Sequence, residues 1–186
     1  MLKTKDQLFF LLSFCMAFIV VVSNYLVQFP VSYFNLEKIL TYGAFTYPIA
    51  FLITDLSNRR YGKAAAKKIV YLGFFLGVFI TLFFSTNFMD LISIRIAVGS
   101  GIAFLIAQLI DVFIFDALRK KIWFVAPIAS SLIGSLIDTL LFFSIAFYGT
   151  GVDWFILSMG DLSVKIFVAL IMLIPFRLLL FRFQEV

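Results

Sequence analysis

The stretch SSLIGSLIDTLLFFSIAF, from Ser130 to Phe147, decides the class of fold. It is an apolar run suited to a membrane-spanning helix, yet Asp138 stands in its middle. A bilayer core about 30 Å thick requires roughly 20 apolar residues at about 1.5 Å per residue. Ionisable side chains at that depth are rare and usually face a bundle interior or a wet cavity. Asp138 is therefore a candidate functional residue.

The rest of the chain extends this pattern. Of its 186 residues, 63% are hydrophobic and 13% are charged. Soluble domains are about half apolar and a quarter charged, so the composition predicts an integral membrane protein. We expect one all-α domain over residues 1–186, a bundle of six transmembrane helices formed by the apolar segments 8–29, 39–56, 64–86, 94–117, 125–147 and 160–181.

The basic residues alternate between the connections. Twelve of the fifteen lie in residues 1–7, in the 57–68 and 118–124 connections, or near the C-terminus. By the positive-inside rule both termini are expected in the cytoplasm, and an even number of helices requires the same outcome. The net charge of +5 therefore indicates membrane topology rather than a nucleic-acid surface. The N-terminal apolar run is too long for a cleaved signal peptide, so we expect an uncleaved first span.

Several chemistries are disfavoured by the residues present. Cys15 is the single cysteine and histidine is absent, which argues against a disulfide framework and most transition-metal sites. The sequence contains no P-loop, His-Glu-x-x-His or Gly-x-Ser-x-Gly motif, so no cofactor, metal or catalytic residue is expected. Asp111 and Asp138 also lack the Tyr-Asp and Gly-x-Gly-Asp contexts of intramembrane aspartyl proteases. We therefore expect no enzyme.

Few polar groups remain inside the predicted spans. They are Asn24, Gln28, Asp55, Gln108, Asp111, Asp138 and Lys165. Gly101 and Gln108 share a helical stripe with Asp111, and Gly134 shares one with Asp138. Small residues let neighbouring backbones approach closely, so we expect these stripes to face the bundle interior. At about 1.5 Å per residue, Asp138 lies about 3 Å to the outer side of its span's centre and Asp111 about 8 Å toward the cytoplasm.

These depths predict an outward-facing pocket lined by Asn24, Asp138 and Lys165. Gln108 and Asp111 would form its floor, with Asp55 deeper still. Carboxylates accept adjacent N–H donors, amides donate and accept, and aromatic faces stack on flat rings. Such a pocket suits a small, planar, amide-rich heterocycle. A proton or cation path could use the same carboxylates.

Local pairing offers alternatives to ligand binding. Lys165 follows Asp161 by four residues, the favourable order for an ion pair, and could instead pair with Asp138 to hold the bundle. Asp111 could bond a neighbouring helix through Gln108 or a serine hydroxyl. In GFFLG, residues 73–77, the two glycines have the spacing of close helix packing.

Five segments resemble the YhhQ-type queuosine precursor transporter family, within the wider vitamin-uptake-like transporter group. They are SNYLVQFPVS (23–32), YGAFTYPIAFLITDLSNRRYG (42–62), QLIDVFIFDALRK (108–120), WFVAPIASSLIGSLIDTLLFFSIAFYG (123–149) and DLSVKIF (161–167). Many members of the wider group have an acidic residue after the loop asparagine, where this chain has Arg59. The YhhQ-type branch is basic nearby, so this departure favours that branch.

The resemblance implies a six-helix importer of the bacterial inner membrane. Its expected substrate is 7-cyano-7-deazaguanine, and also the aminomethyl form, for salvage into tRNA queuosine. The seven polar residues stand where the family has its intramembrane polar groups. On this reading Asp138 or Asp111 accepts the ring's N–H donors, Asn24, Gln28 or Gln108 addresses its carbonyl and amine, and Lys165 sets the local charge.

Two rival functions stay open. One is the substrate-binding subunit of an energy-coupling-factor importer for a vitamin-like heterocycle. The first span lacks the Ala-xxx-Ala spacing usual for docking in such subunits, which disfavours this rival. The other is a membrane scaffold that transports nothing. As protein partners, a second copy of this chain and a coupling module both stay open.

Overall fold

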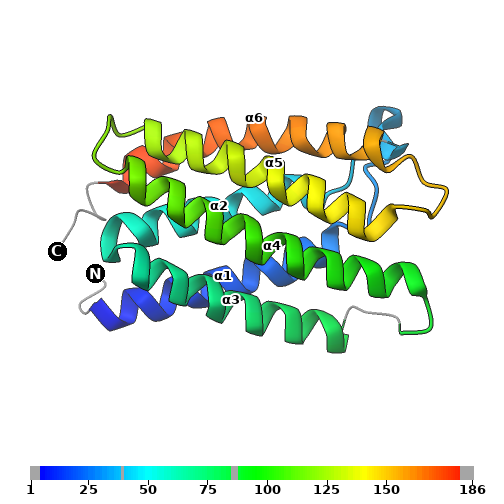
Figure 1. Cartoon of the computed structure of the whole chain (residues 1–186), viewed down its shortest axis with the longest axis horizontal. Coiled ribbons are helices and arrows are strands. Elements are labelled where there is room, and N and C mark those ends of the chain that lie inside the picture. The colour runs from blue at the N-terminus through cyan, green and yellow to red at the C-terminus, as the bar shows by residue number, and fades with distance from the viewer. Residues whose placement is uncertain (1–4, 39, 85–87, 181–186) are drawn as a thin grey trace.

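The structure, a computed structural model, describes residues 5–38, 40–84 and 88–180. The described residues are all-helical, with six α-helices and one short 3₁₀ helix, which confirms the predicted fold class and helix number (Figure 1). The elements are α1 Lys5–Leu26, η1 Tyr33–Lys38, α2 Gly43–Tyr61, α3 Lys63–Phe84, α4 Leu91–Leu118, α5 Val125–Phe147 and α6 Trp154–Leu180.

Five of these helices are long and apolar enough to cross a membrane, so the chain is a multi-pass membrane protein. They are α1, α3, α4, α5 and α6. Helix α2 is more polar and is not among them. Its 19 residues span about 28 Å, close to the thickness of a bilayer core. Most of them are buried, so α2 is shielded from lipid by protein.

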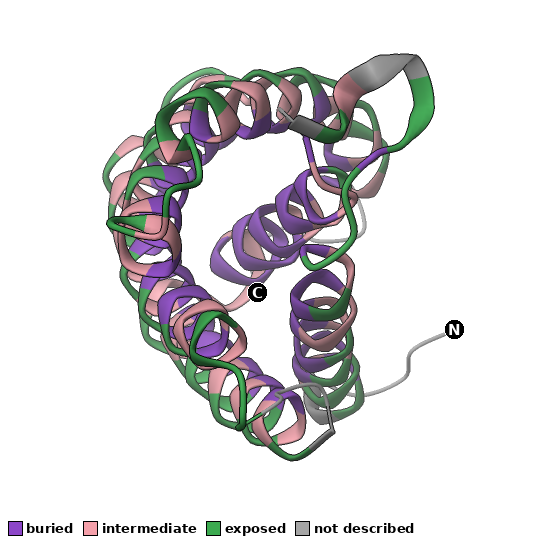
Figure 2. Ribbon diagram, turned by 90° about the vertical axis from the view of Figure 1, so that its right-hand side faces the viewer, coloured by how far each residue is buried: buried purple, intermediate pink, exposed green. Residues whose placement is uncertain are grey.

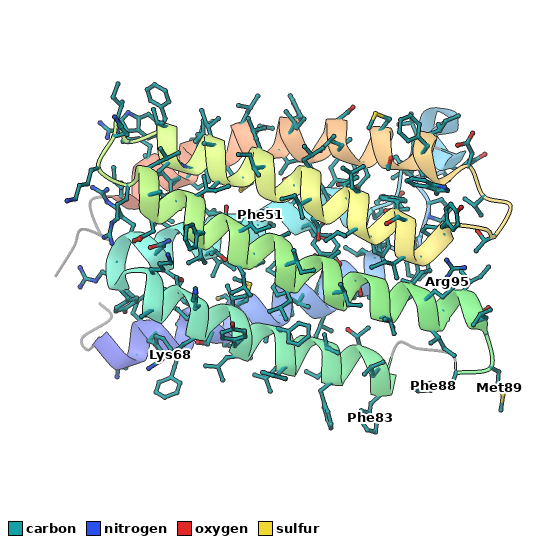
Figure 3. All side chains as sticks on the ribbon, in the orientation of Figure 1. Phe51, Lys68, Phe83, Phe88, Met89 and Arg95 are labelled. Carbon is teal, nitrogen blue, oxygen red and sulfur yellow. The ribbon has the colours of Figure 1, made fainter. Side chains whose placement is uncertain are left out.

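The other helices enclose α2. Neighbouring pairs contact one another in the spatial order α1, α3, α4, α5, α6, and α2 contacts all five. Figure 2 shows these five as a curved wall, with α2 as the mainly purple helix inside the curve. Side chains on the outside of the wall, such as Phe83, are exposed, whereas Phe51 of α2 is buried (Figure 3).

Glycines bring α1 and α3 into close contact. A Cβ atom at Gly73 would lie 2.2 Å from Cγ of Met16, and one at Gly77 would lie 2.4 Å from Cγ1 of Val20. The helix-packing interpretation of GFFLG is confirmed, because both glycines face a neighbouring helix of the same chain. Helices α1 and α3 therefore pack directly, although α2 lies between them in the sequence.

Helix α1 begins and α6 ends at the same end of the bundle, which we call the termini end; the opposite end is the loop end (Figure 1). At the termini end Gly62 alone connects α2 to α3, with a φ of +80° that favours glycine. Arg59 donates to the backbone carbonyl of Arg119 over 2.7 Å, and Arg119 donates to that of Arg59 over 3.2 Å. These reciprocal bonds tie the ends of α2 and α4 together.

Candidate functional site

Lys165 of α6 lies at the centre of a buried ionic group, the lysine cluster, made of Asp138, Thr139, Asp161 and Lys165. Its Nζ lies 2.8 Å from Oδ2 of Asp138 and 2.6 Å from Oδ2 of Asp161. Thr139 accepts from Lys165 over 3.1 Å and donates to Asp161 over 2.8 Å. Both predicted pairings of Lys165 therefore exist at once. They join α5 to α6 and satisfy the ammonium of a lysine that is only 1% exposed.

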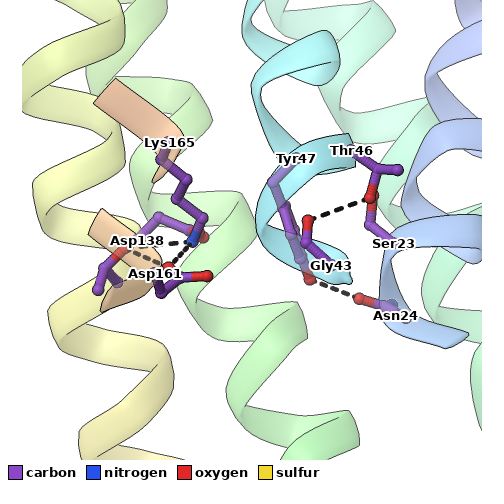
Figure 4. A network of polar contacts seen from close by, with 9 residues as sticks. Ser23, Asn24, Gly43, Thr46, Tyr47, Asp138, Asp161 and Lys165 are labelled. Atoms are coloured by element: carbon purple, nitrogen blue, oxygen red, sulfur yellow. Dashed lines mark hydrogen bonds and ion pairs between the residues drawn. The ribbon is translucent and has the colours of Figure 1, made fainter. Parts of the chain in front are cut away.

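Tyr47 of α2 connects this cluster with α1 and α3. Nζ of Lys165 lies 5.0 Å from the centre of the Tyr47 ring. The Tyr47 hydroxyl donates to Oδ1 of Asn24 over 2.6 Å (Figure 4), and Nδ2 of Asn24 donates to Oγ1 of Thr81 over 3.0 Å. The predicted residues Asn24, Asp138 and Lys165 thus belong to one connected network, nearer the loop end.

A second polar region lies nearer the termini end, where α2 faces α4. The hydroxyl of Thr54 donates to Oε1 of Gln108. One turn farther along α2, Nδ2 of Asn58 donates to the carbonyl of Val112 over 2.9 Å. These two contacts fix the register of α2 against α4.

Asp55 and Asp111, which we call the paired aspartates, lie beside each other within that register. Both are buried, with 1% and 0% of their surfaces exposed. Ser130 of α5 donates its hydroxyl to Oδ1 of Asp55 over 3.1 Å. Neither oxygen of Asp111 has a hydrogen-bond partner among the described residues. A buried acceptor without a donor costs free energy, so Asp111 requires an explanation.

The predicted bond through Gln108 is not observed within the described part of the chain, because Oε1 of Gln108 accepts from Thr54 instead. The Ser130 hydroxyl of α5 donates to Oδ1 of Asp55 and also lies near the Asp111 carboxyl group.

Gln28 does not join either group. It lies beyond the end of α1 at Leu26, is exposed, and donates to the backbone carbonyl of Asn24 over 3.3 Å. The predicted first span, 8–29, is therefore too long at this end, and Gln28 does not continue the helical face of Asn24.

Sequence reasoning also missed several members of these groups. Asp161 was predicted to pair with Lys165 but was not counted among the site residues. Helix α6 begins at Trp154, six residues before the predicted start, so Asp161 is a buried helical residue one turn before Lys165. Thr139, Ser130 and Tyr47 gave no comparable signal, because single hydroxyls in apolar helices are common.

A small cavity reaches Asp55. It has a volume of about 10 Å³ and is lined in part by Pro48, Pro127, Ser131 and Phe176. That is room for about one water molecule, so this conformation does not admit a larger ligand there. Within the described ranges, no three acidic or cysteine side chains meet as a metal site.

A multi-pass helical bundle with buried ionisable groups facing its interior is typical of membrane transporters. Residues 41–180 match the family described as "Putative vitamin uptake transporter", and the chain belongs to this family. It is therefore a transporter and not an enzyme. The match confirms the transporter group that the five sequence segments resemble.

Bacterial relatives cover most of the chain. A "Probable queuosine precursor transporter" of Haemophilus influenzae is 34% identical, over 93% of this chain and 86% of the relative. The "Queuosine precursor transporter" of Escherichia coli strain K12 is 32% identical, over 89% and 83%. A "Probable queuosine precursor transporter" of Bacillus subtilis is 30% identical, over 71% and 66%. No solved structure matches the chain.

Proposed function

We propose that this chain imports a queuosine precursor across the bacterial inner membrane. The expected substrate is 7-cyano-7-deazaguanine, with the 7-aminomethyl form recognised through the same ring edge, for salvage into tRNA queuosine. The names of the bacterial relatives support this substrate class. The buried polar groups offer a chemistry that suits it.

The observation that carries this proposal is the unpartnered carboxyl group of Asp111. Neither of its two buried oxygens receives a hydrogen bond among the described residues, so both can accept one from a ligand. A 7-deazaguanine presents a ring N–H and an exocyclic amine side by side, which a carboxylate accepts together. Gln108 lies one turn earlier on α4, and its oxygen is occupied by Thr54. Its amide nitrogen would donate to the ring carbonyl.

The remaining site residues take supporting roles. Asp138 is a less suitable acceptor than Asp111, because it already binds Lys165. Lys165 would set the electrostatic potential along the path, and Asn24 would contribute its amide near the loop end. Gln28, exposed beyond α1, would meet the substrate only at the entrance.

Transport would proceed by alternating access around these interior groups. The cavity beside Asp55 holds about one water, so helices must separate before a bicyclic ring can enter. Pro48 in α2 and Pro175 in α6 each remove a helical hydrogen bond. Bending at these prolines would let α2, which contacts every other helix, move relative to α6.

The termini end would face the cytoplasm, with all six helices crossing the membrane. This end carries the basic residues of the two connections at 57–68 and 118–124, together with Arg177. An excess of lysine and arginine marks the cytoplasmic side. Helix α2 would cross inside the protein wall, where its polar residues do not meet lipid.

A strain that cannot make the precursor provides the test. We expect the chain to restore queuosine in tRNA when 7-cyano-7-deazaguanine is supplied at low concentration, measured by mass spectrometry of tRNA nucleosides. Asp111→Asn should lower the uptake rate roughly tenfold or more, because it loses a charge-assisted hydrogen bond and places an N–H against the ring's own donors. Asp116→Asn, on the same helix, should transport like wild type.

Failure of the wild-type chain to restore the modification would refute the substrate. Equal uptake by Asp111→Asn and wild type would instead refute the assigned site. Copurification with ATPase subunits would favour the energy-coupling-factor alternative.

A further inference from the structure

The buried interior holds more acid than base. Among the described residues, the fully buried acidic and basic side chains are Asp55, Asp111, Asp138, Asp161 and Lys165. The ammonium of Lys165 is shared between Asp138 and Asp161. The paired aspartates are therefore left without a cation.

The helices packed around the pair supply no compensating charge. The acidic neighbour of Asp55 is Asp111, on α4. Helix α5 contributes the Ser130 hydroxyl, and α6 contributes apolar side chains such as Met172 and Phe176. Among the described residues, α1 and α3 carry no buried acidic or basic side chain.

Two neighbouring carboxyls in a water-poor interior do not both ionise, because the charges repel and there is room for little water to solvate them. Such a pair retains one proton, and that proton belongs to both groups. The hydrogen bonds fit this state. Ser130 supplies one donor to Asp55, and Asp111 has none among the described residues. A shared proton between the two carboxyls supplies the missing donor.

We propose that Asp55 is the proton acceptor of the substrate site, an inference that rests on the proposed function. In the empty transporter, Asp55 and Asp111 share one proton. When a neutral 7-deazaguanine donates its two N–H groups to Asp111, that carboxyl must be ionised, and the proton moves onto Asp55. The pair holds one proton and one negative charge before and after binding. No proton is exchanged with solvent.

The surroundings of Asp55 suit this role. The water-sized cavity touches Asp55 and also Ser131. One water there would accept a hydrogen bond from protonated Asp55 and pass one to the Ser131 hydroxyl. Asp111 is absent from the residues that line this cavity, so the two carboxyls have different neighbours and can take different roles.

Calorimetry with 7-cyano-7-deazaguanine on the purified full chain tests the transfer. Wild-type binding should keep the same Kd between about pH 6 and 8, and its enthalpy should not depend on the buffer's ionisation enthalpy. In Asp55→Asn, Asp111 loses its proton acceptor and must release its proton to solvent. The Kd of this variant should therefore fall about tenfold for each unit by which the pH is raised. Asp116→Asn should behave like wild type.

Release of about one proton by the wild-type protein on binding would overturn this inference. A folded Asp55→Asn protein that binds independently of pH, or binds no ligand, would overturn it too. If Asp55→Asn does not fold, the buffer comparison on wild type decides alone. A wild-type chain that binds no 7-deazaguanine refutes the proposed function as well, whereas pH-dependent wild-type binding refutes only the proton transfer.

Discussion

The ring of Phe51 on α2 lies directly against Gly134 on α5. A Cβ atom at Gly134 would stand 2.6 Å from Cε1 of that ring. Along α2, Phe51 lies one turn from Tyr47 and one turn from Asp55. The contact therefore forms an apolar layer between the lysine cluster and the paired aspartates, and a substrate passing between these groups must displace it.

Gly134→Ala should destabilise this closed layer. The added methyl group overlaps a buried ring, and overpacking of this kind costs about 1–3 kcal/mol. We expect a lower melting temperature in detergent and slower uptake. Gly134→Ala combined with Phe51→Leu should recover most of the lost stability, because leucine removes the ring atoms that clash. An unchanged melting temperature in the single variant would contradict the contact.

Lys165→Met should be strongly destabilising. It removes the ammonium and leaves Asp138 and Asp161 buried beside each other, a loss of about 3–5 kcal/mol for a broken buried ion pair. Adding Asp138→Asn and Asp161→Asn should restore a folded protein. Thermal unfolding of the single and triple variants measures the difference. Equal melting temperatures for both would show that the cluster does not hold α5 to α6.

The two glycines of α3 should differ in their tolerance of alanine. Gly77 faces Val20, whose branched side chain is stiff, whereas Gly73 faces the flexible side chain of Met16. Gly77→Ala should therefore lower the melting temperature more than Gly73→Ala. A larger loss for Gly73→Ala than for Gly77→Ala would contradict this, because it would mean that the flexibility of the facing side chain does not decide the cost.

Labelling with a membrane-impermeant maleimide tests the orientation. Lys121→Cys lies at the termini end and Val152→Cys at the loop end, and both native side chains are exposed. In a Cys15→Ser background we expect Val152→Cys to react in intact cells and Lys121→Cys only after permeabilisation. Labelling in the opposite pattern would place both termini outside.

Hydropathy located each helix that meets lipid, although not always its ends. The predicted segment 125–147 has the same bounds as α5, whereas α6 begins six residues before the predicted 160. It failed at α2, which was expected at 39–56 and extends from Gly43 to Tyr61. The polar run around Asp55 and Asn58 ended the apolar segment too early. In the folded chain those side chains bond α4 and α5 instead of facing lipid, so the helix continues.

Helical depth was sufficient to group part of the candidate site. It placed Asn24, Asp138 and Lys165 on the same side of the bilayer centre, and the structure connects them through Tyr47. It could not reveal which partner each polar atom would choose, because that depends on how α2 is rotated between its neighbours. That neither oxygen of Asp111 receives a hydrogen bond among the described residues is likewise a property of packing alone.

The enclosed position of α2 has a consequence for biogenesis. Helix α2 lacks the apolar length to remain in lipid unaided, and its polar partners on α4 and α5 are synthesised after it. Helices α1 and α3, by contrast, already fit together through Gly73 and Gly77. Stable integration of α2 must therefore wait for segments that the ribosome makes later, and the bundle closes around it only near the end of translation.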